Sequence, residues 1–268
     1  ERNTKIISSV IDEKGIPNYG SEDIAKLFGK KEIFNFPKPK ELVYHLLNYF
    51  TKNDDLVLDF FSGSGTTAHA IMNLNLKTNG NRKFIMVQLP EKTDEKSEAF
   101  KAGYKNICEI GKERIRRAGK KIKEESPLTT QDLDTGFRVL KLDSTNMQDI
   151  YYSPKDISQA DLFSQVDNVK PDRTGEDLLF QVMLELGATL DSKIETTTVA
   201  GKTIYNVAEG YLVACFDPNV TDEVVKAIAQ MQPAYVVLRD TSMKDDSTAT
   251  NFEQIFKTYS PDTVTRIL

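Results

Sequence analysis

Apolar and polar positions follow recognisable periods along this chain, and one stretch combines three kinds of element. Residues 56–58 form a short continuous apolar run that ends at Asp59, as is typical of a strand buried on both faces of a sheet. Gly63 and Gly65 then predict a tight turn, and residues 66 to about 75 predict a helix whose first amides face the same crevice. A strand, a glycine turn and a helix in this order indicate the ligand-binding corner of an open α/β sheet.

The segments before this corner predict two helices. Ser21 is a candidate N-cap and Gly29 a candidate end for a short helix. Residues 4–19 show no clear period and are predicted to be a loop. Apolar residues at helical spacing predict an amphipathic helix at 41–50, in which His45 is expected to lie at the surface or edge.

The segments after the corner continue the α/β pattern. Residues 84–89 predict a second buried strand after a turn at Asn79-Gly80. Residues 103–123 predict a long helix with an apolar stripe at spacings of three and four. Residues 137–142, introduced by Gly136, predict a third strand.

A polar stretch separates these elements from a second α/β pattern. Residues 143 to about 170 are weakly patterned and contain Ser153-Pro154 and Lys170-Pro171, so they predict a linker. Beyond them, the periods predict helices at 177–186, 224–231 and 252–257 and strands at 194–199, 203–207, 211–216, 235–238 and 264–267.

Length and composition narrow the class of protein. A chain of 268 residues can form one large or two modest domains, each with its own core. No apolar run approaches the ~20 residues that span a membrane, and Glu1-Arg2-Asn3 begins no signal-like segment, so a cytoplasmic location is expected. Cys108 and Cys215 fall in separate predicted elements and are expected to be reduced thiols. Two His and two Cys without ligand spacing predict no metal site.

The charge is weakly acidic, with a formal net charge of −5. A protein that holds DNA by itself usually presents a basic face, because phosphate contacts supply much of the affinity. Basic residues concentrate here only at 105–123, so this chain is not expected to be the whole DNA-binding surface. Six of them are interpreted first as a solvated helix face: Lys112, Arg114, Arg116, Arg117, Lys120 and Lys121. As the alternative, the last four of these contact phosphates.

The chemistry of the corner separates its possible ligands. A phosphate-binding loop needs a Lys where this chain has Thr66. Residues 63–68 formally fit the dinucleotide fingerprint, but a pyrophosphate would share space with the Asp59 carboxylate. S-adenosylmethionine carries a sulfonium and an ammonium group, which an acid at Asp59 would favour. A glycine turn without a ligand remains the alternative to this cofactor.

Several further segments accompany the glycine turn in a fixed order. They are Phe36-Pro37-Lys38-Pro39, Phe84-Ile85-Met86-Val87-Gln88-Leu89-Pro90-Glu91, Gly111-Lys112-Glu113-Arg114-Ile115-Arg116-Arg117, Gly136-Phe137 and Val236-Val237-Leu238-Arg239-Asp240. Together with Asp59-Phe60-Phe61-Ser62-Gly63-Ser64-Gly65-Thr66-Thr67, they resemble amino-group DNA methyltransferases of the β arrangement. More closely, the combination is similar to the adenine-methylating modification subunit of type III restriction–modification systems, in its C-terminal portion.

This resemblance implies an α/β fold, with a partial Rossmann-like sheet of an S-adenosylmethionine-dependent methyltransferase followed by a second, smaller α/β domain. Residues 1–145 would be the cofactor-binding part of a DNA methyltransferase domain. Residues 146–170 would be a linker, and 171–268 a C-terminal α/β domain used for assembly.

The resemblance also implies the residues that contact S-adenosylmethionine. At the end of the second strand, Gln88 stands where related sheets use an acid to bind the ribose hydroxyls; Glu91 is the nearest alternative acid. Pro37 and Pro39 line the methionine end of the cofactor or, equally, stiffen a connector. The implied contacts are Phe36, Lys38, Pro39, Asp59, Phe60, Phe61, Gly63, Ser64, Gly65, Thr66, Thr67, Gln88 and Leu89.

The catalytic motif of the resembled family is absent from these residues. Such enzymes flip the target base out of the duplex and hold its amine at an Asp-Pro-Pro-Tyr motif, which precedes the cofactor motif in the β arrangement. The nearest imitation, Asp217-Pro218-Asn219-Val220, lacks the aromatic residue and is better interpreted as a turn. The chain alone is therefore expected to be inactive, with an unpaired edge on its first strand.

The resemblance implies partners for this chain, and two other functions remain as alternatives. The implied partners are double-stranded DNA, held through the missing upstream half, a restriction (helicase and nuclease) subunit, and a second copy bound through the C-terminal domain. A non-enzymatic assembly module is one alternative. A self-contained small-molecule methyltransferase or dehydrogenase is the other, although the absent general base and the absent acid at Gln88 disfavour it.

Overall fold

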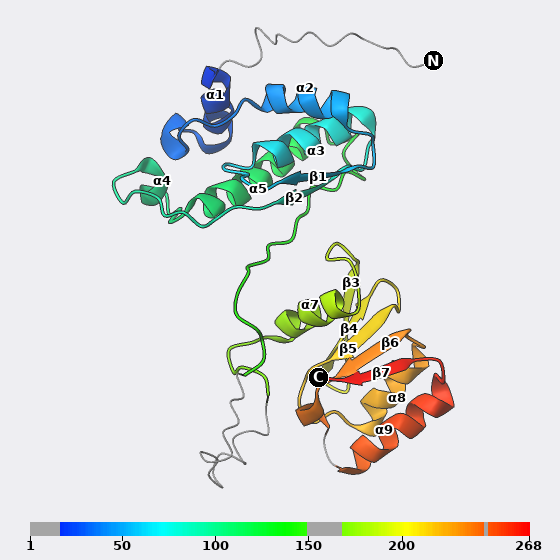
Figure 1. Cartoon of the computed structure of the whole chain (residues 1–268). Coiled ribbons are helices and arrows are strands. Elements are labelled where there is room, and N and C mark those ends of the chain that lie inside the picture. The colour runs from blue at the N-terminus through cyan, green and yellow to red at the C-terminus, as the bar shows by residue number, and fades with distance from the viewer. Residues whose placement is uncertain (1–16, 149–167, 244–245) are drawn as a thin grey trace. The chain divides into compact units, whose positions relative to one another are not determined.

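A computed structural model describes residues 17–148, 168–243 and 246–268 of this chain, which forms two compact units (Figure 1). The first unit is Glu1–Phe137 and the second is Arg138–Leu268. Each contains helices and a β-sheet, so the mixed α/β class is confirmed. The roles assigned to 1–145, 146–170 and 171–268 stay predictions.

The first unit is built around a βαβ crossover. Strand β1 (Leu56–Asp59) lies parallel to β2 (Lys83–Met86), with Leu58 opposite Ile85, and α3 (Thr66–Thr78) connects them. The other elements of this unit are α1 (Pro17–Phe28), the 3-10 helix η1 (Lys31–Ile33), α2 (Lys40–Phe50), α4 (Glu98–Lys101) and α5 (Ile107–Glu125).

Helix α3 is the centre of this unit, because it is apolar on several sides. Ala70, Ile71 and Leu74 pack with Leu47 of α2 and with Val57 and Phe84 of the strands. On another side, Ala68 and Met72 pack with Ile115, Ala118 and Ile122 of α5. Figure 1 shows α3 beside both strands. The helices therefore cover one face of the two-stranded sheet.

The other face of this sheet carries exposed apolar side chains, so the prediction of strands buried on both faces is wrong. Leu58 is 58% exposed and its cross-strand neighbour Ile85 is 46% exposed. Leu56 and Val87 are exposed on either side of them. The physical reason is that α2, α3 and α5 contact only the side chains that point to their own face, such as Val57 and Phe84.

Several predicted boundaries in the first unit need correction. Helix α1 begins at Pro17, so Ser21 lies inside it and does not cap it; most of the predicted loop at 4–19 lies outside the described residues. Gly29, with φ of +80°, does end the helix. The predicted helix at 103–123 begins only at Ile107, because the Asn106 side chain accepts a hydrogen bond from the Glu109 amide and caps it.

Two predicted strands of the first half also differ. Strand β2 ends at Met86. The Val87 backbone still bonds to Asp59 and Ser62, but Gln88 and Leu89 do not continue the strand. The predicted strand at 137–142 has no strand structure, and Val139, Leu140 and Leu142 are exposed. An apolar segment becomes a strand only where its backbone groups pair with another strand, and residues 137–142 pair with none of the described strands.

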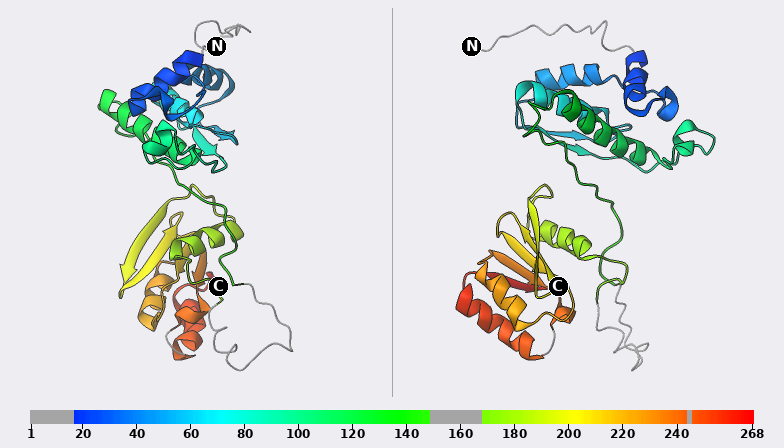
Figure 2. Two further views of the ribbon diagram at one scale, coloured as in Figure 1. Left: turned by 90° about the vertical axis from the view of Figure 1, so that its left-hand side faces the viewer. Right: turned by 180° about the vertical axis from the view of Figure 1, so that it is seen from behind.

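The second unit contains a mixed five-stranded sheet in the order β3-β4-β5-β6-β7. The first three strands pair antiparallel and the last three parallel. Helix α7 covers one face, and α8 and α9 cover the other (Figure 2). The elements are α7 (Gly175–Glu185), β3 (Ile194–Val199), β4 (Lys202–Val207), β5 (Leu212–Cys215), α8 (Asp222–Gln230), β6 (Tyr235–Leu238), the 3-10 helix η2 (Asp240–Ser242), α9 (Asp246–Tyr259) and β7 (Val264–Ile267).

The predicted elements of this unit are found at nearly the same residues, except that α9 is longer than 252–257. Asp217 follows β5 and its Oδ2 accepts a hydrogen bond from the Thr203 amide at 2.6 Å. This contact agrees with the interpretation of Asp217-Pro218-Asn219-Val220 as a structural turn. The predicted linker falls mostly on residues outside the described ranges.

Three general features of the described residues concern membrane spans, metal sites and thiols. None of their helices combines the length and apolar character needed to cross a bilayer. No group of His, Cys, Asp and Glu side chains among them is arranged to hold a metal ion. Cys108 and Cys215 are both free thiols, as predicted.

Candidate cofactor-binding corner

Asp59 ends β1 and is held by the helix that follows. Its Oδ2 accepts a hydrogen bond from the Thr67 hydroxyl at 2.6 Å, and its Oδ1 accepts a longer one from the Phe61 amide at 3.4 Å. Thr67 lies in the first turn of α3. The carboxylate is therefore fixed beside the amino end of α3, where unpaired backbone amides also lie.

The glycine turn packs directly against α5. Gly63 and Gly65 both adopt left-handed backbone conformations, with φ of +51° and +75°. A Cβ on Gly65 would lie 3.2 Å from the carbonyl oxygen of Gly111, and a Cβ on Gly111 would lie 3.1 Å from that of Gly63. The close approach therefore favours glycine at 65 and 111, whereas Gly63 is favoured by its left-handed conformation.

Gln88 braces the turn from the end of the second strand. Its Oε1 accepts a hydrogen bond from the Gly63 amide at 2.8 Å, and its Nε2 donates to the Leu89 carbonyl at 3.2 Å. The Cys108 thiol donates to the backbone carbonyl of Gln88 at 3.3 Å. Both ends of this amide thus have protein partners, and the contact with a ribose stays a prediction. The alternative acid, Glu91, is exposed.

The Lys-Pro segment reaches the same corner. Pro37 and Pro39 are buried, whereas the Lys38 side chain is exposed and its carbonyl oxygen lies 3.4 Å from the Thr66 hydroxyl. A Cβ on Gly20 of α1 would lie only 1.9 Å from the Pro37 carbonyl oxygen. Helix α1 therefore presses this segment against the start of α3.

Aromatic and aliphatic side chains surround the corner and are open to solvent. Phe36 is 90% exposed, and Phe60, Phe61 and Leu89 are also exposed. The rings of Phe60 and Phe61 lie with centroids 5.3 Å apart. Exposed apolar groups beside a polar turn suit a ligand with both an aromatic and a charged part.

Arg114 of α5 also belongs to this corner, and its prediction as part of a solvated helix face is wrong. It is completely buried, and its Nη1 donates hydrogen bonds to the hydroxyls of Ser64 and Thr66, each at 2.7 Å. Burial lowers the pKa of Arg114 to about 10, although Asp23 opposes this shift. The signal in the sequence was its spacing, since Arg114 lies three residues after Gly111 on the buried side of α5.

His69, one turn into α3, is also buried. Burial, and after it the positive charges of Arg114, Lys40 and Lys121, lowers the pKa of His69 well below 6.5. Its imidazole is therefore neutral at pH 7. The second histidine, His45, lies on α2 with its Nε2 3.4 Å from Glu41, as expected of a surface residue.

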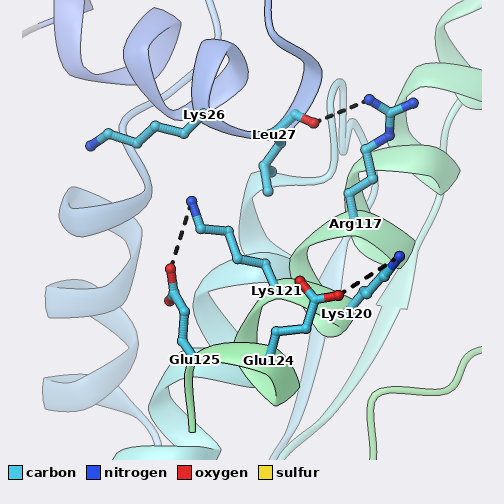
Figure 3. Close-up of a pocket in the computed structure, with 7 residues that line it drawn as sticks. All are labelled: Lys26, Leu27, Arg117, Lys120, Lys121, Glu124 and Glu125. Carbon is cyan, nitrogen blue, oxygen red and sulfur yellow. Dashed lines mark hydrogen bonds and ion pairs between the residues drawn. The ribbon is translucent and has the colours of Figure 1, made fainter.

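The basic face of α5 forms a groove with the end of α1, with a volume of about 380 Å³ (Figure 3). Lys120 and Lys121 each lie 3.7 Å from a glutamate one turn later, Glu124 and Glu125. Arg117 donates to the Leu27 carbonyl at 3.1 Å, and both Arg116 and Arg117 lie near Glu113. These pairs favour a solvated helix face over phosphate contact, and no predicted cofactor contact lines the groove.

Comparison with known proteins finds several relatives of this chain. Residues 2–120 match the family described as DNA methylase. The chain is 35% identical over 230 residues to the type III restriction-modification enzyme EcoP15I Mod subunit of Escherichia coli, covering 84% of this chain and 32% of that protein. It is 35% identical over 215 residues to the EcoPI Mod subunit of Escherichia phage P1, covering 78% and 31%.

A shorter match has a higher identity. The StyLTI Mod subunit of Salmonella typhimurium is 43% identical over 119 residues, which is 44% of this chain and 18% of that subunit. The chain thus spans about a third of the length of the first two relatives. By sequence, this chain is similar to the modification subunits of type III restriction–modification enzymes, and its residues 2–120 match the DNA methylase family.

Proposed function

We propose that this chain carries the S-adenosylmethionine-binding part of a site-specific, adenine-specific DNA methyltransferase, the modification subunit of a type III restriction–modification system. The observation that supports it best is the corner at the end of β1. There, a carboxylate fixed by Thr67 stands beside a glycine turn and a helix start, in the segment that matches the DNA methylases.

The residues of the corner fit this cofactor chemically. Asp59 is an acceptor for the ammonium group, and the turn at Gly63 and Gly65 has no side chains between its backbone and a ligand. The exposed rings of Phe36, Phe60 and Phe61 offer apolar contact to the adenosine. The remaining proposed contacts are Lys38, Pro39, Ser64, Thr66, Thr67, Gln88 and Leu89. When bound, the cofactor supplies the methyl group.

The open sheet supports the proposal that further polypeptide completes the enzyme. Among the described residues, each strand of the two-stranded sheet has a strand neighbour on one side only, and one face exposes Leu58 and Ile85. Parallel strands are normally covered on both faces. In this proposal, the catalytic Asp-Pro-Pro-Tyr-type motif and the DNA contacts belong to polypeptide beyond these residues, and the Rossmann-like sheet is completed there.

The second unit is assigned to assembly. Its sheet is covered on both faces by its own helices and its core is closed, so it has the character of an independent module. We assign to it pairing with a second copy and association with a restriction subunit. Analytical ultracentrifugation of the chain tests this: a species that stays monomeric at all concentrations contradicts the pairing.

Calorimetric titration with S-adenosylhomocysteine, the demethylated product, tests the cofactor assignment. Asp59→Ala should weaken binding about tenfold or more, because it removes a charge-assisted contact worth roughly 1.5–3 kcal/mol. Asp54→Ala is the matched control, since Asp54 is exposed just before β1. Unchanged affinity in the Asp59 variant, or an equal loss in the control, would refute the assignment.

A further inference from the structure

We propose that Arg114 is a positioning residue of the cofactor corner: it fixes the glycine turn through Ser64 and Thr66 and places a positive charge behind it that favours the carboxylate of the cofactor's amino-acid part. This inference rests on the proposed function. It assigns to α5, which lies outside the glycine motif, a direct part in cofactor recognition.

The hydrogen bonds of Arg114 support the first part of the inference, that this residue fixes the glycine turn. A single nitrogen, Nη1, bonds to hydroxyls on both sides of Gly65, each at 2.7 Å. The backbone of the turn closes with a hydrogen bond from the Gly65 amide to the Ser62 carbonyl at 2.8 Å. Arg114 therefore links the turn, through Ser64, to the start of α3, through Thr66.

The positive charge of Arg114 supports the second part of the inference, which concerns the carboxylate of the cofactor. Within the described part of the chain, Arg114 forms no ion pair, and its buried Nε and Nη2 have no hydrogen-bond partner. Asp23 attracts the guanidinium without bonding to it, and the neighbouring His69 is neutral. The amino end of α3 adds a positive potential at the same place.

The negative charge of Asp59 and the positive charge of Arg114 lie at different places around the turn, so they orient a charged ligand. Asp59 bonds to Thr67 on one flank of the turn, whereas Arg114 lies behind Ser64 and Thr66. A ligand that carries both an ammonium and a carboxylate group is favoured with its ammonium toward the acid and its carboxylate toward the arginine. The amino-acid part of S-adenosylmethionine is such a ligand.

Two ligands separate this role from that of a merely structural arginine. S-adenosylhomocysteine contains the carboxylate, and 5′-methylthioadenosine lacks the whole amino-acid part. Arg114→Met should weaken the first about fivefold or more and change the second less than about twofold, since a buried charge acts strongly only on another charge. Arg114→Lys should restore most of the preference. Equal losses for both ligands would overturn the role of the Arg114 charge in favouring the carboxylate.

A control variant, Arg116→Met, and a second measurement, amide hydrogen exchange, complete the test. Arg116→Met removes the same charge from an exposed position of the same helix and should leave both affinities unchanged. Amide hydrogen exchange without any ligand should be faster at Gly63 and Gly65 in Arg114→Met, or in Arg114→Lys if the methionine variant does not fold. Unchanged exchange there would contradict the positioning role.

The outcomes also distinguish the two proposals. If the unmodified chain binds neither ligand but the turn amides exchange faster in the Arg114 variant, cofactor binding by this chain is refuted and the positioning of the turn stands. If S-adenosylhomocysteine binds normally to the Arg114 variant, only the inference fails.

Discussion

The contact between the glycine turn and α5 predicts a specific cost for Gly65→Ala. Gly65 has φ of +75°, and a left-handed conformation costs a residue with a Cβ roughly 1–2 kcal/mol. The new Cβ would also lie 3.2 Å from the Gly111 carbonyl oxygen and 3.3 Å from Ile115 Cγ1. Overpacking of this kind costs typically about 1–3 kcal/mol, so the total loss of stability is expected to be roughly 2–5 kcal/mol.

Gly29→Ala is the matched control for this prediction. Gly29 has φ of +80°, but nothing lies within 4 Å of the position of its Cβ. It should lose only the conformational part, roughly 1–2 kcal/mol. The difference between the two variants measures the close approach of the turn to α5.

Amide hydrogen exchange of α3 is the suitable assay, because the chain has no Trp and optical unfolding would mix the two units. The most protected amides of α3 report the opening of the first unit by itself. A Gly65→Ala variant that loses no more stability than Gly29→Ala would refute the argument that the turn and α5 touch.

Three further outcomes follow from the described contacts. Arg82→Met should destabilise the first unit by about 1.5–3 kcal/mol, measured by the same exchange method, because buried Arg82 donates to the Thr51 and Thr78 hydroxyls at 2.8 and 3.0 Å. Leu58→Ser on the open face should change stability by less than about 0.5 kcal/mol, whereas Val57→Ala on the covered face should cost about 1 kcal/mol or more; equal costs would contradict an open face. The 268-residue chain should incorporate no tritiated methyl into duplex DNA, and robust labelling would show that catalytic residues lie within it.

Local chemistry made much of the first unit predictable. The apolar run before Asp59, the two glycines and the helix after them each depend on near neighbours in the sequence, and the structure contains β1, the turn and α3 in that order. The strands of the second unit were predictable for the same reason, because turn residues such as Gly201 and Gly210 separate apolar runs.

Contacts between distant residues were not predictable in this way. The partner of Ser64 and Thr66 is Arg114, which is separated from them along the chain by 50 and 48 positions. Gln88, at the position where related sheets place an acid for the ribose, accepts a hydrogen bond from the Gly63 amide. Only the packing of α5 against the turn brings these side chains together.

The sequence by itself therefore determined the order of the elements, the position of the glycine turn and the resemblance to modification subunits, because these depend on local periods and motifs. Tertiary structure alone decided which face of the first sheet is covered, that residues 137–142 form no strand, and that a buried arginine stands behind the turn. Burial and strand pairing depend on what lies opposite in space, and a one-dimensional pattern does not contain that information.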